Sequence, residues 1–377
     1  MTKSGKSAIM TFVSYRGVAQ LVAHTSGGRD AAGSSPVTPT KKSPAICRAF
    51  ILSTEKRLIK MAETFFATLS PMLVMFMCML VGFILKKKNL VPDDSDKVIS
   101  KLENYICVPA LVISTFMNYC TVASLKQYYN LILYALIALA AALVISLPLS
   151  KVFAGKDKYK RSIYKYALTF GNFGFMGNAI VPAILGAADN EILYKYLLFT
   201  LPLNVLVYTW GIMILIPEGE TKQNPIKSLI NPIFISIILG AAIGLTGATS
   251  YIPSFIVQTI DYLKACMAPL AMILTGFVIG QYSFKSLLTN KRVYIATALR
   301  LFILPAIIIS VLMLTGASEL VITLAFFAFA TPLGLNTVVF PAAYGGETQT
   351  GAAMAMISHT LCVITIPIMF MLLNTVI

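Results

Sequence analysis

The chain has 377 residues, of which 57% are hydrophobic and only 12% are charged, and its mean hydropathy is +0.80. This composition excludes an ordinary soluble globular protein and predicts an all-α polytopic membrane protein. The formal net charge of +15 does not indicate nucleic-acid binding, because the basic residues gather in the first sixty residues and in short connections between apolar segments.

Residues 1–60 form a polar, acid-poor segment without a sustained helical or strand period. Such a segment is typical of a transit peptide. The stretch GVAQLVAHTSGGRDAAGSSPVTPT at 17–40 resembles instead the translation of a transfer RNA gene. The favoured interpretation is a misassigned start, with a disordered extension over 1–60 and a protein that begins at Met61. No functional residue is predicted before Met61.

Ten apolar segments follow, each long enough as a helix to cross a hydrocarbon core of about 30 Å. We group them as a first five-helix repeat over 61–216, a cytoplasmic linker over 217–226 and a second five-helix repeat over 227–377. The expected helices are 62–85, 95–117, 127–150, 162–186, 191–216, 227–247, 254–280, 287–314, 319–344 and 350–375.

The distribution of lysine and arginine predicts how the spans are oriented. Basic residues flank the odd-numbered connections, at 86–101, 151–165, 222–227 and 285–292, and are scarce in the even-numbered ones. Because positively charged loops stay in the cytoplasm, the odd-numbered connections should be cytoplasmic and both termini outside. The sequence therefore predicts a multi-pass protein of the cell membrane.

Two echoes indicate an internal repeat. Pro-Ala-x-x-Gly occurs in VPAILGAAD at 181–189 and again in FPAAYGGET at 340–348, and Pro109 is echoed by Pro269 at nearly the same displacement. Five crossings are an odd number, so the second copy enters the membrane from the opposite side. The predicted architecture is two inverted five-helix repeats.

The fourth and ninth helices carry the helix-breaking residues. Their midsections read FGNFGFMGNAIVP at 170–182 and ATPLGLNTVVFP at 330–341. Proline and glycine there predict that each helix unwinds near the membrane centre. An unwound backbone survives in a membrane only when it is buried or lines a polar cavity. Two half-helix N-termini meeting at one depth would attract an anion, most simply a carboxylate.

The alternative is that these small and polar residues merely let helices pack closely. Asn204 in the fifth helix could line the cavity or hydrogen-bond between helices. The candidate substrate-binding residues are Asn172, Asn178, Pro182, Asn204, Thr331, Pro332, Asn336 and Pro341.

Four ionisable residues inside spans are candidates for gating or coupling. Arg300 could clamp a substrate carboxylate or act as a gating partner, or could extend to the cytoplasmic surface. Glu103 and Lys264, at equivalent repeat positions, could form a scaffold ion pair or sit near water at helix ends. His359 could relay protons or serve as a hydrogen-bonded packing residue.

The chain from Met61 to Ile377 resembles the auxin efflux carrier family of secondary transporters, in a bacterial branch that includes malate and malonate permeases. The matching stretches are GFILKKKNLVPDDSDKVISKLENYICVPALV at 82–112, GNFGFMGNAIVPAILG at 171–186 and TPLGLNTVVFPAAYGG at 331–346. The resemblance implies a scaffold of helices one, two, six and seven, a mobile transport domain, broken fourth and ninth helices that cross at the binding site, and elevator-like movement.

This chain departs from the plant members of the family at two places. Plant members have a Pro-Asn pair at the fourth-helix crossover, where this chain has Gly171 and Asn172, so substrate identity does not transfer. They also carry an acid–lysine pair near the start of the third helix. This chain has Lys126 there without a neighbouring acid, so Lys126 is a fifth candidate for gating or coupling that lacks the family's acidic partner.

The leading hypothesis is a secondary transporter for a small organic anion, working by alternating access. A sodium-coupled symporter of the bile-acid type would share the architecture but needs acidic ligands, and neither 162–186 nor 321–346 contains Asp or Glu. An intramembrane hydrolase would need a catalytic pair or an HExxH site, which the sequence lacks. No catalytic residue, metal site or cofactor is predicted. The expected partners are the anion, the lipid bilayer and a second copy bound through the scaffold, with no nucleic acid.

Overall fold

The computed structural model describes residues 44–217, 227 and 230–377. Most of the expected cytoplasmic linker and of the expected N-terminal extension therefore lies outside the described residues. By its internal contacts the chain divides into Met1–Glu55 and Lys56–Ile377. The described residues contain helices and no strand, with one isolated β-bridge between Gly171 and Leu333.

The helices before residue 218 include three π-helical turns. They are α2 (Pro44–Lys87), α3 (Ser95–Leu102), η1 (Glu103–Cys107), α4 (Val108–Tyr119), α5 (Val122–Tyr128), α6 (Asn130–Ala154), α7 (Lys158–Thr169), η2 (Phe173–Gly177), α8 (Asn178–Leu185), α9 (Ile192–Leu206), η3 (Val207–Gly211) and α10 (Ile212–Leu215).

The helices after residue 229 include one 3₁₀ turn and one π-helical turn. They are α12 (Pro232–Thr246), η4 (Ala248–Tyr251), α13 (Ser254–Gly280), α14 (Phe284–Leu288), α15 (Lys291–Ala298), η5 (Leu299–Ile303), α16 (Leu304–Leu314), α17 (Glu319–Phe329), α18 (Asn336–Ala343) and α19 (Gln349–Val376).

Seven helices in the described part of the chain are long and apolar enough to cross a membrane, which confirms a multi-pass helical membrane protein. Three further apolar helices are shorter, at Phe173–Leu185, Pro232–Thr246 and Glu319–Phe329. The long ones are Arg57–Lys87, Ser95–Tyr119, Val122–Ala154, Ile192–Leu215, Ser254–Gly280, Lys291–Leu314 and Gln349–Val376. The ten-span inverted repeat stays a prediction.

The first helix begins earlier than the sequence pattern predicted. α2 starts at Pro44, so the expectation of disorder over 1–60 is wrong for 44–60, and the helix reaches Lys87. Proline is favourable in the first turn of a helix, and after Pro44 the segment up to residue 60 has no glycine or proline to end it.

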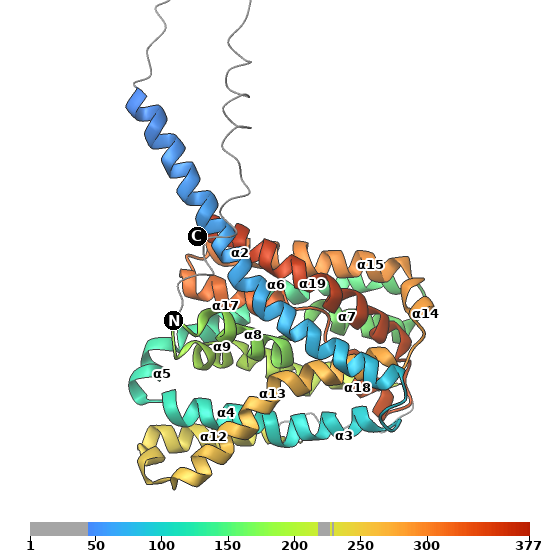
Figure 1. Ribbon diagram of the computed structural model, residues 1–377. Helices are drawn as coiled ribbons and strands as arrows, with labels where there is room; N and C mark the ends of the chain where they lie inside the picture. Colours follow the sequence, from blue (N-terminus) through green and yellow to red (C-terminus); the bar gives the residue numbers. More distant parts are fainter. Residues whose placement is uncertain (1–43, 218–226, 228–229) are drawn as a thin grey trace, which may run out of the picture. The chain divides into compact units, whose positions relative to one another are not determined.

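One group of helices packs through glycines. We call α2, α3, η1, α4, α12 and α13 the scaffold group, and Figure 1 shows α3, α4, α12 and α13 together. A Cβ built at Gly276 of α13 would collide with the backbone of α2 at Met79 and Phe83. At Gly240 of α12 a Cβ would lie 2.8 Å from the Cβ of Phe116 on α4. Glycine therefore lets these backbones approach closely, as in other membrane helix pairs.

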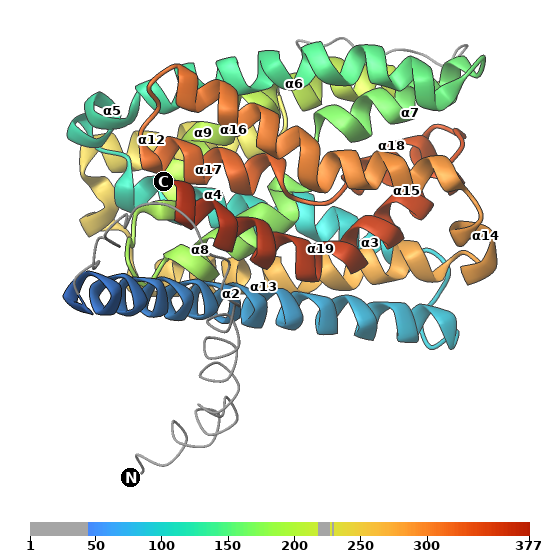
Figure 2. The ribbon, with the colours of Figure 1, turned by 90° about the horizontal axis from the view of Figure 1, so that it is seen from above.

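A second group surrounds the buried centre of the protein. We call α6 to α10 and α15 to α19, with η2, η3 and η5, the core group. Within it α6 packs on α7, α9 and α16, α16 packs on α17, and α15 packs on α19, as Figure 2 shows from above. The largest fully buried aromatic side chains lie on α7, α9 and α17 of this group, together with Phe170, which directly follows α7. Two helical segments of this group are interrupted, and both interruptions lie at the candidate site.

Candidate functional site

The two interruptions meet. α7 ends at Thr169 and η2 begins at Phe173, while α17 ends at Phe329 and α18 begins at Asn336. The two non-helical segments between these helices run antiparallel and are joined at the bridge between Gly171 and Leu333. There the Asn172 N–H donates to the Pro332 carbonyl at 2.7 Å. We call residues 170–172 and 330–335 the crossing. The prediction that both segments unwind is confirmed.

The prolines that were expected to cause the unwinding play different roles. Pro182 and Pro341 lie inside α8 and α18, and the chain breaks several residues before each of them. A proline inside a helix removes one ladder hydrogen bond, to the carbonyl four residues earlier, so each of these eight-residue helices loses a single bond. Pro332 does lie in the crossing. Of the expected binding prolines, neither Pro182, Pro332 nor Pro341 lines the cavity described below.

Gly171 is required by close packing at the crossing. A Cβ built on it would collide with the Arg300 guanidinium and the Thr331 hydroxyl, and would lie 2.9 Å from the Thr331 carbonyl oxygen. Gly334 approaches the same place, where a Cβ would lie 3.3 Å from the Gly171 carbonyl oxygen. Gly171 thus makes room for an arginine from another helix.

Arg300 supplies positive charge at the C-terminal ends of the interrupted helices. It is 0% exposed on η5, and its Nη1 donates to the carbonyls of Leu168 at 3.1 Å and Thr169 at 3.5 Å. These are the last carbonyls of α7, the negative end of its dipole. The guanidinium carbon also lies 5.8 Å from the ring centroid of Phe329, the last residue of α17. The interpretation that Arg300 extends to the cytoplasmic surface is therefore wrong.

The N-terminal ends of the second half-helices carry backbone donors without acceptors. Within the described chain, no acceptor binds the N–H groups of 173–175 at the start of η2 or those of Leu335 and Asn336 at the start of α18. The Gly334 N–H belongs to the bridge between the two segments. Unpaired N–H groups at a helix start carry partial positive charge and favour an anion. Two such groups of donors from opposite sides of the crossing border one cavity.

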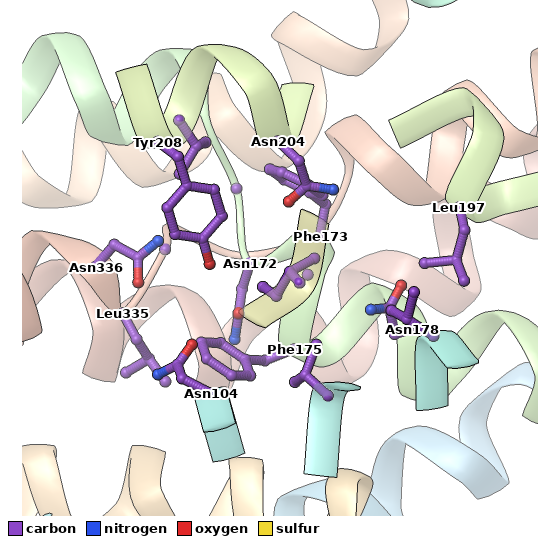
Figure 3. Close-up of a pocket in the computed structure, with 17 residues that line it drawn as sticks. Asn104, Asn172, Phe173, Phe175, Asn178, Leu197, Asn204, Tyr208, Leu335 and Asn336 are labelled. Atoms are coloured by element: carbon purple, nitrogen blue, oxygen red, sulfur yellow. The ribbon is translucent and has the colours of Figure 1, made fainter. Parts of the chain in front are cut away.

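This cavity has a volume of about 50 Å³, room for a few water molecules, and lies between the scaffold and core groups. Figure 3 shows its side chains, with five asparagines from four different parts of the chain. Its lining is Asn104, Val108, Val112, Gly171, Asn172, Phe173, Gly174, Phe175, Asn178, Leu197, Asn204, Val207, Tyr208, Ile233, Gly334, Leu335 and Asn336. No carboxylate or basic side chain is among them.

The asparagines differ in how their amides are held. Asn336 donates to the Tyr166 hydroxyl at 2.7 Å, and Asn204 donates to the Thr200 carbonyl at 3.2 Å within its own helix. The Oδ1 of Asn178 is buried without a hydrogen-bond partner. Since an unpaired buried amide oxygen is costly, Asn178 is the amide most in need of a ligand or water.

The side chain of Asn172 is hydrogen-bonded to a histidine that lies outside the cavity. Its Nδ2 lies 3.0 Å from His359 Nε2, and His359 Nδ1 lies 2.8 Å from the Ala355 carbonyl oxygen one turn earlier in α19. His359 is 2% exposed and does not line the cavity, whereas Asn172 does. Ser358 supports the other chain of the crossing by accepting from the Leu333 N–H at 3.1 Å.

Four of the predicted binding residues thus line the cavity, and the others do not. Asn172, Asn178, Asn204 and Asn336 line it. Thr331 is fully buried at the crossing, where its hydroxyl donates to the Ala328 carbonyl at 3.2 Å. Thr331 therefore does not line the cavity.

The expected ion pair between Glu103 and Lys264 is not formed. Lys264 Nζ lies 3.1 Å from the Ser114 hydroxyl and 3.4 Å from Asp261 Oδ1. Glu103 is 0% exposed and neither carboxylate oxygen has a hydrogen-bond partner. Lys126 is exposed on α5 and does not line the cavity.

Sequence reasoning missed three polar residues of the site. Asn104 and Tyr208 line the cavity, and Tyr166 binds Asn336. Asn104 lies within the π-helical turn η1 and Tyr208 within η3, so both positions depend on local changes in helical register. A regular helical period read from the sequence cannot register such changes.

A family model described as "Membrane transport protein" matches residues 67–370. The chain belongs to this family. The match confirms the resemblance to the auxin efflux carriers at the level of the family, and it indicates a transporter rather than an enzyme. The chain is also similar to an uncharacterized transporter of Methanocaldococcus jannaschii, with 24% identity over 217 residues, which are 56% of this chain and 69% of that relative.

Proposed function

We propose that this membrane transport protein is a secondary active transporter for a small organic anion, a carboxylate, which binds at the crossing. The observation that carries the proposal is the double set of unpaired N–H groups, at 173–175 and 335–336, that border one asparagine-lined cavity. Backbone donors at helix starts bind carboxylates without needing a charged side chain.

The size of the cavity supports alternating access. At about 50 Å³ the cavity holds a few waters, so a dicarboxylate needs the surrounding helices to separate. Asn104, Val108, Val112 and Ile233 come from the scaffold group, and the other lining residues come from the core group and the crossing. Movement of the core group against the scaffold would open the cavity, in line with the elevator-like movement implied by the family resemblance.

The ten-span inverted-repeat architecture belongs to the same proposal. The three shorter apolar helices and the seven long ones together cover the ten expected segments. The interruptions lie at corresponding places in the two predicted repeats, and each is followed by an eight-residue helix with a proline inside it, α8 and α18. Dimerisation through the scaffold group and both termini outside stay part of this proposal.

The sodium-coupled alternative receives less support. Sodium prefers oxygen ligands that include a carboxylate, and no carboxylate lines the cavity. The positive charge of Arg300 beside the crossing also disfavours a bound cation. Transport that requires sodium would favour this alternative over the proposal.

Uptake by the purified protein in lipid vesicles tests the binding role of the amides. We expect Asn172→Ala or Asn336→Ala to abolish carboxylate transport while leaving membrane insertion intact. Asn118→Ala is the matched control, because Asn118 is exposed on α4, donates only to the Ser114 carbonyl and does not line the cavity.

The substrate class is tested by thermal unfolding of the purified protein with mono- and dicarboxylates, since a ligand that binds only the folded state raises the melting temperature. Wild-type transport rates in both asparagine variants would contradict the binding role. The proposal also fails if no carboxylate stabilises the protein and none is transported.

A further inference from the structure

Two hydrogen bonds, between His359 and Ala355 and between His359 and Asn172, connect a buried titratable group to the wall of the cavity. His359 Nδ1 lies 2.8 Å from the Ala355 carbonyl oxygen, and His359 Nε2 lies 3.0 Å from Asn172 Nδ2. Asn172 is only 3% exposed, but it lines the cavity. Its Oδ1 takes no hydrogen bond within the described chain. A change at His359 can therefore reach the cavity through one side chain.

The hydrogen-bond partners fix the tautomer of the neutral histidine. A backbone carbonyl can only accept, so Nδ1 must carry the hydrogen that it donates to Ala355. The neutral ring then has a lone pair at Nε2, which accepts a hydrogen bond. Asn172 must turn its NH₂ toward His359 to supply that hydrogen. The group left for the cavity is the amide oxygen, which repels a carboxylate.

Protonation of Nε2 reverses this arrangement. The imidazolium donates from both nitrogens, so the amide group of Asn172 must turn its oxygen toward His359 to accept. The NH₂ then becomes available to the cavity as a donor. We propose that this inversion of the Asn172 amide makes His359 the proton-coupling residue, so that one proton is taken up with each anion bound.

The surroundings of His359 explain why proton and anion bind together. The charged side chains on α7, α13, α14 and α15, the helices packed against α19, are exposed or half-buried, and α18 has no titratable residue. The buried titratable groups on the elements packed against α19 are Arg300 on η5 and Tyr164 and Tyr166 on α7, and on α19 itself Cys362, whose Sγ lies 3.1 Å from the His359 carbonyl oxygen. None of these is a carboxylate. A charged imidazole is therefore costly until an anion arrives to balance it.

The inference rests on the proposed function and adds its coupling ion. Because the effect of one ligand on the other is reciprocal, a proton that promotes anion binding must itself bind more tightly when the anion is present. As the pH rises, anion affinity should fall about tenfold per pH unit, since each pH unit is worth about 1.36 kcal/mol per linked proton. This slope applies over the pH range in which His359 is neutral in the empty protein and protonated in the protein with anion bound.

Binding of malonate to the full-length protein, measured against pH above malonate's own titrations, tests the coupling. We expect the tenfold slope in the wild type and no slope in His359→Gln, whose side chain keeps a hydrogen bond to Asn172 but cannot be protonated. Thr360→Ala is the control, because Thr360 is exposed beside His359 and donates only to the Met356 carbonyl. It should keep the slope. A pH-independent wild type, or the same slope in His359→Gln, overturns the inference.

A second measurement is independent of any ligand and of the folding of the variant. The chain has two histidines, so ¹⁵N-histidine NMR of the full-length protein resolves them, and His24→Gln identifies the other. The neutral His359 should carry its hydrogen on Nδ1, and acid should protonate Nε2. A neutral ring protonated at Nε2 overturns the inference. If malonate binds without the slope, the inference fails while the transporter proposal stands, and if no carboxylate binds, the transporter proposal fails.

Discussion

Replacing Gly171 by alanine should destabilise the crossing. A Cβ at this position would collide with the Arg300 guanidinium and the Thr331 hydroxyl. It would also lie 2.9 Å from the Thr331 carbonyl oxygen, which is backbone and can move only if the two chains of the crossing separate. Side-chain atoms alone could turn away, but the carbonyl cannot. The substitution therefore strains the bridge between Gly171 and Leu333.

The expected cost follows from overpacking. Inserting one methyl group into a close-packed site typically costs about 1–3 kcal/mol. In proteins of moderate size one kcal/mol lowers the melting temperature by roughly 2–4 °C, so a fall of several degrees is expected. The assay is thermal unfolding of the purified protein in detergent, with all variants compared at one scan rate because membrane proteins often unfold irreversibly.

Gly174→Ala is the matched control. A Cβ at Gly174 would meet nothing within 4 Å, and the residue lies in the helical turn η2 where alanine is favourable. This variant should be at least as stable as the wild type. The reasoning is refuted if Gly171→Ala melts at the wild-type temperature, or if both alanine variants lose stability equally.

Two further predictions concern polar groups around the cavity. Tyr166→Phe removes the acceptor of the 2.7 Å hydrogen bond from Asn336 and should cost about 0.5–1.5 kcal/mol of unfolding free energy, whereas Tyr129→Phe, at an exposed tyrosine, should cost nothing measurable; equal losses would contradict a special role for Tyr166. Glu103→Gln and Lys264→Gln should change the free energy of unfolding additively, within about 0.3–0.5 kcal/mol, because Lys264 binds Ser114 and Asp261 and not Glu103. A larger coupling energy in a double-mutant cycle would show that Glu103 and Lys264 do form an ion pair.

The sequence predicted where the helices are interrupted better than why. Glycine, proline and asparagine inside two apolar segments indicate broken helices on general grounds, because unwound backbone in a membrane must be buried or line a cavity. The prolines misled the reasoning about cause. Pro182 and Pro341 lie within helices, while the breaks fall where Gly171 and Leu333 meet. That meeting is a contact between segments about 160 residues apart.

Charge at the centre of the protein shows the same division. The sequence identified Arg300, Glu103 and His359 as unusual because ionisable groups are costly within a membrane. It gave no means of knowing that Arg300 caps α7 or that His359 holds Asn172. It suggested a pair of Glu103 with Lys264 from repeat position, and the packing joined Lys264 to other partners.

By itself the amino-acid sequence determined that the chain is an apolar, multi-helix membrane protein with two polar interruptions, because hydropathy and helix-breaking residues act locally along the chain. Only the tertiary structure decided which amides share a cavity, which carbonyls Arg300 neutralises and which nitrogen of His359 faces Asn172. Those outcomes depend on packing between distant helices, where a shift of one residue in helical register turns a side chain away from its partner.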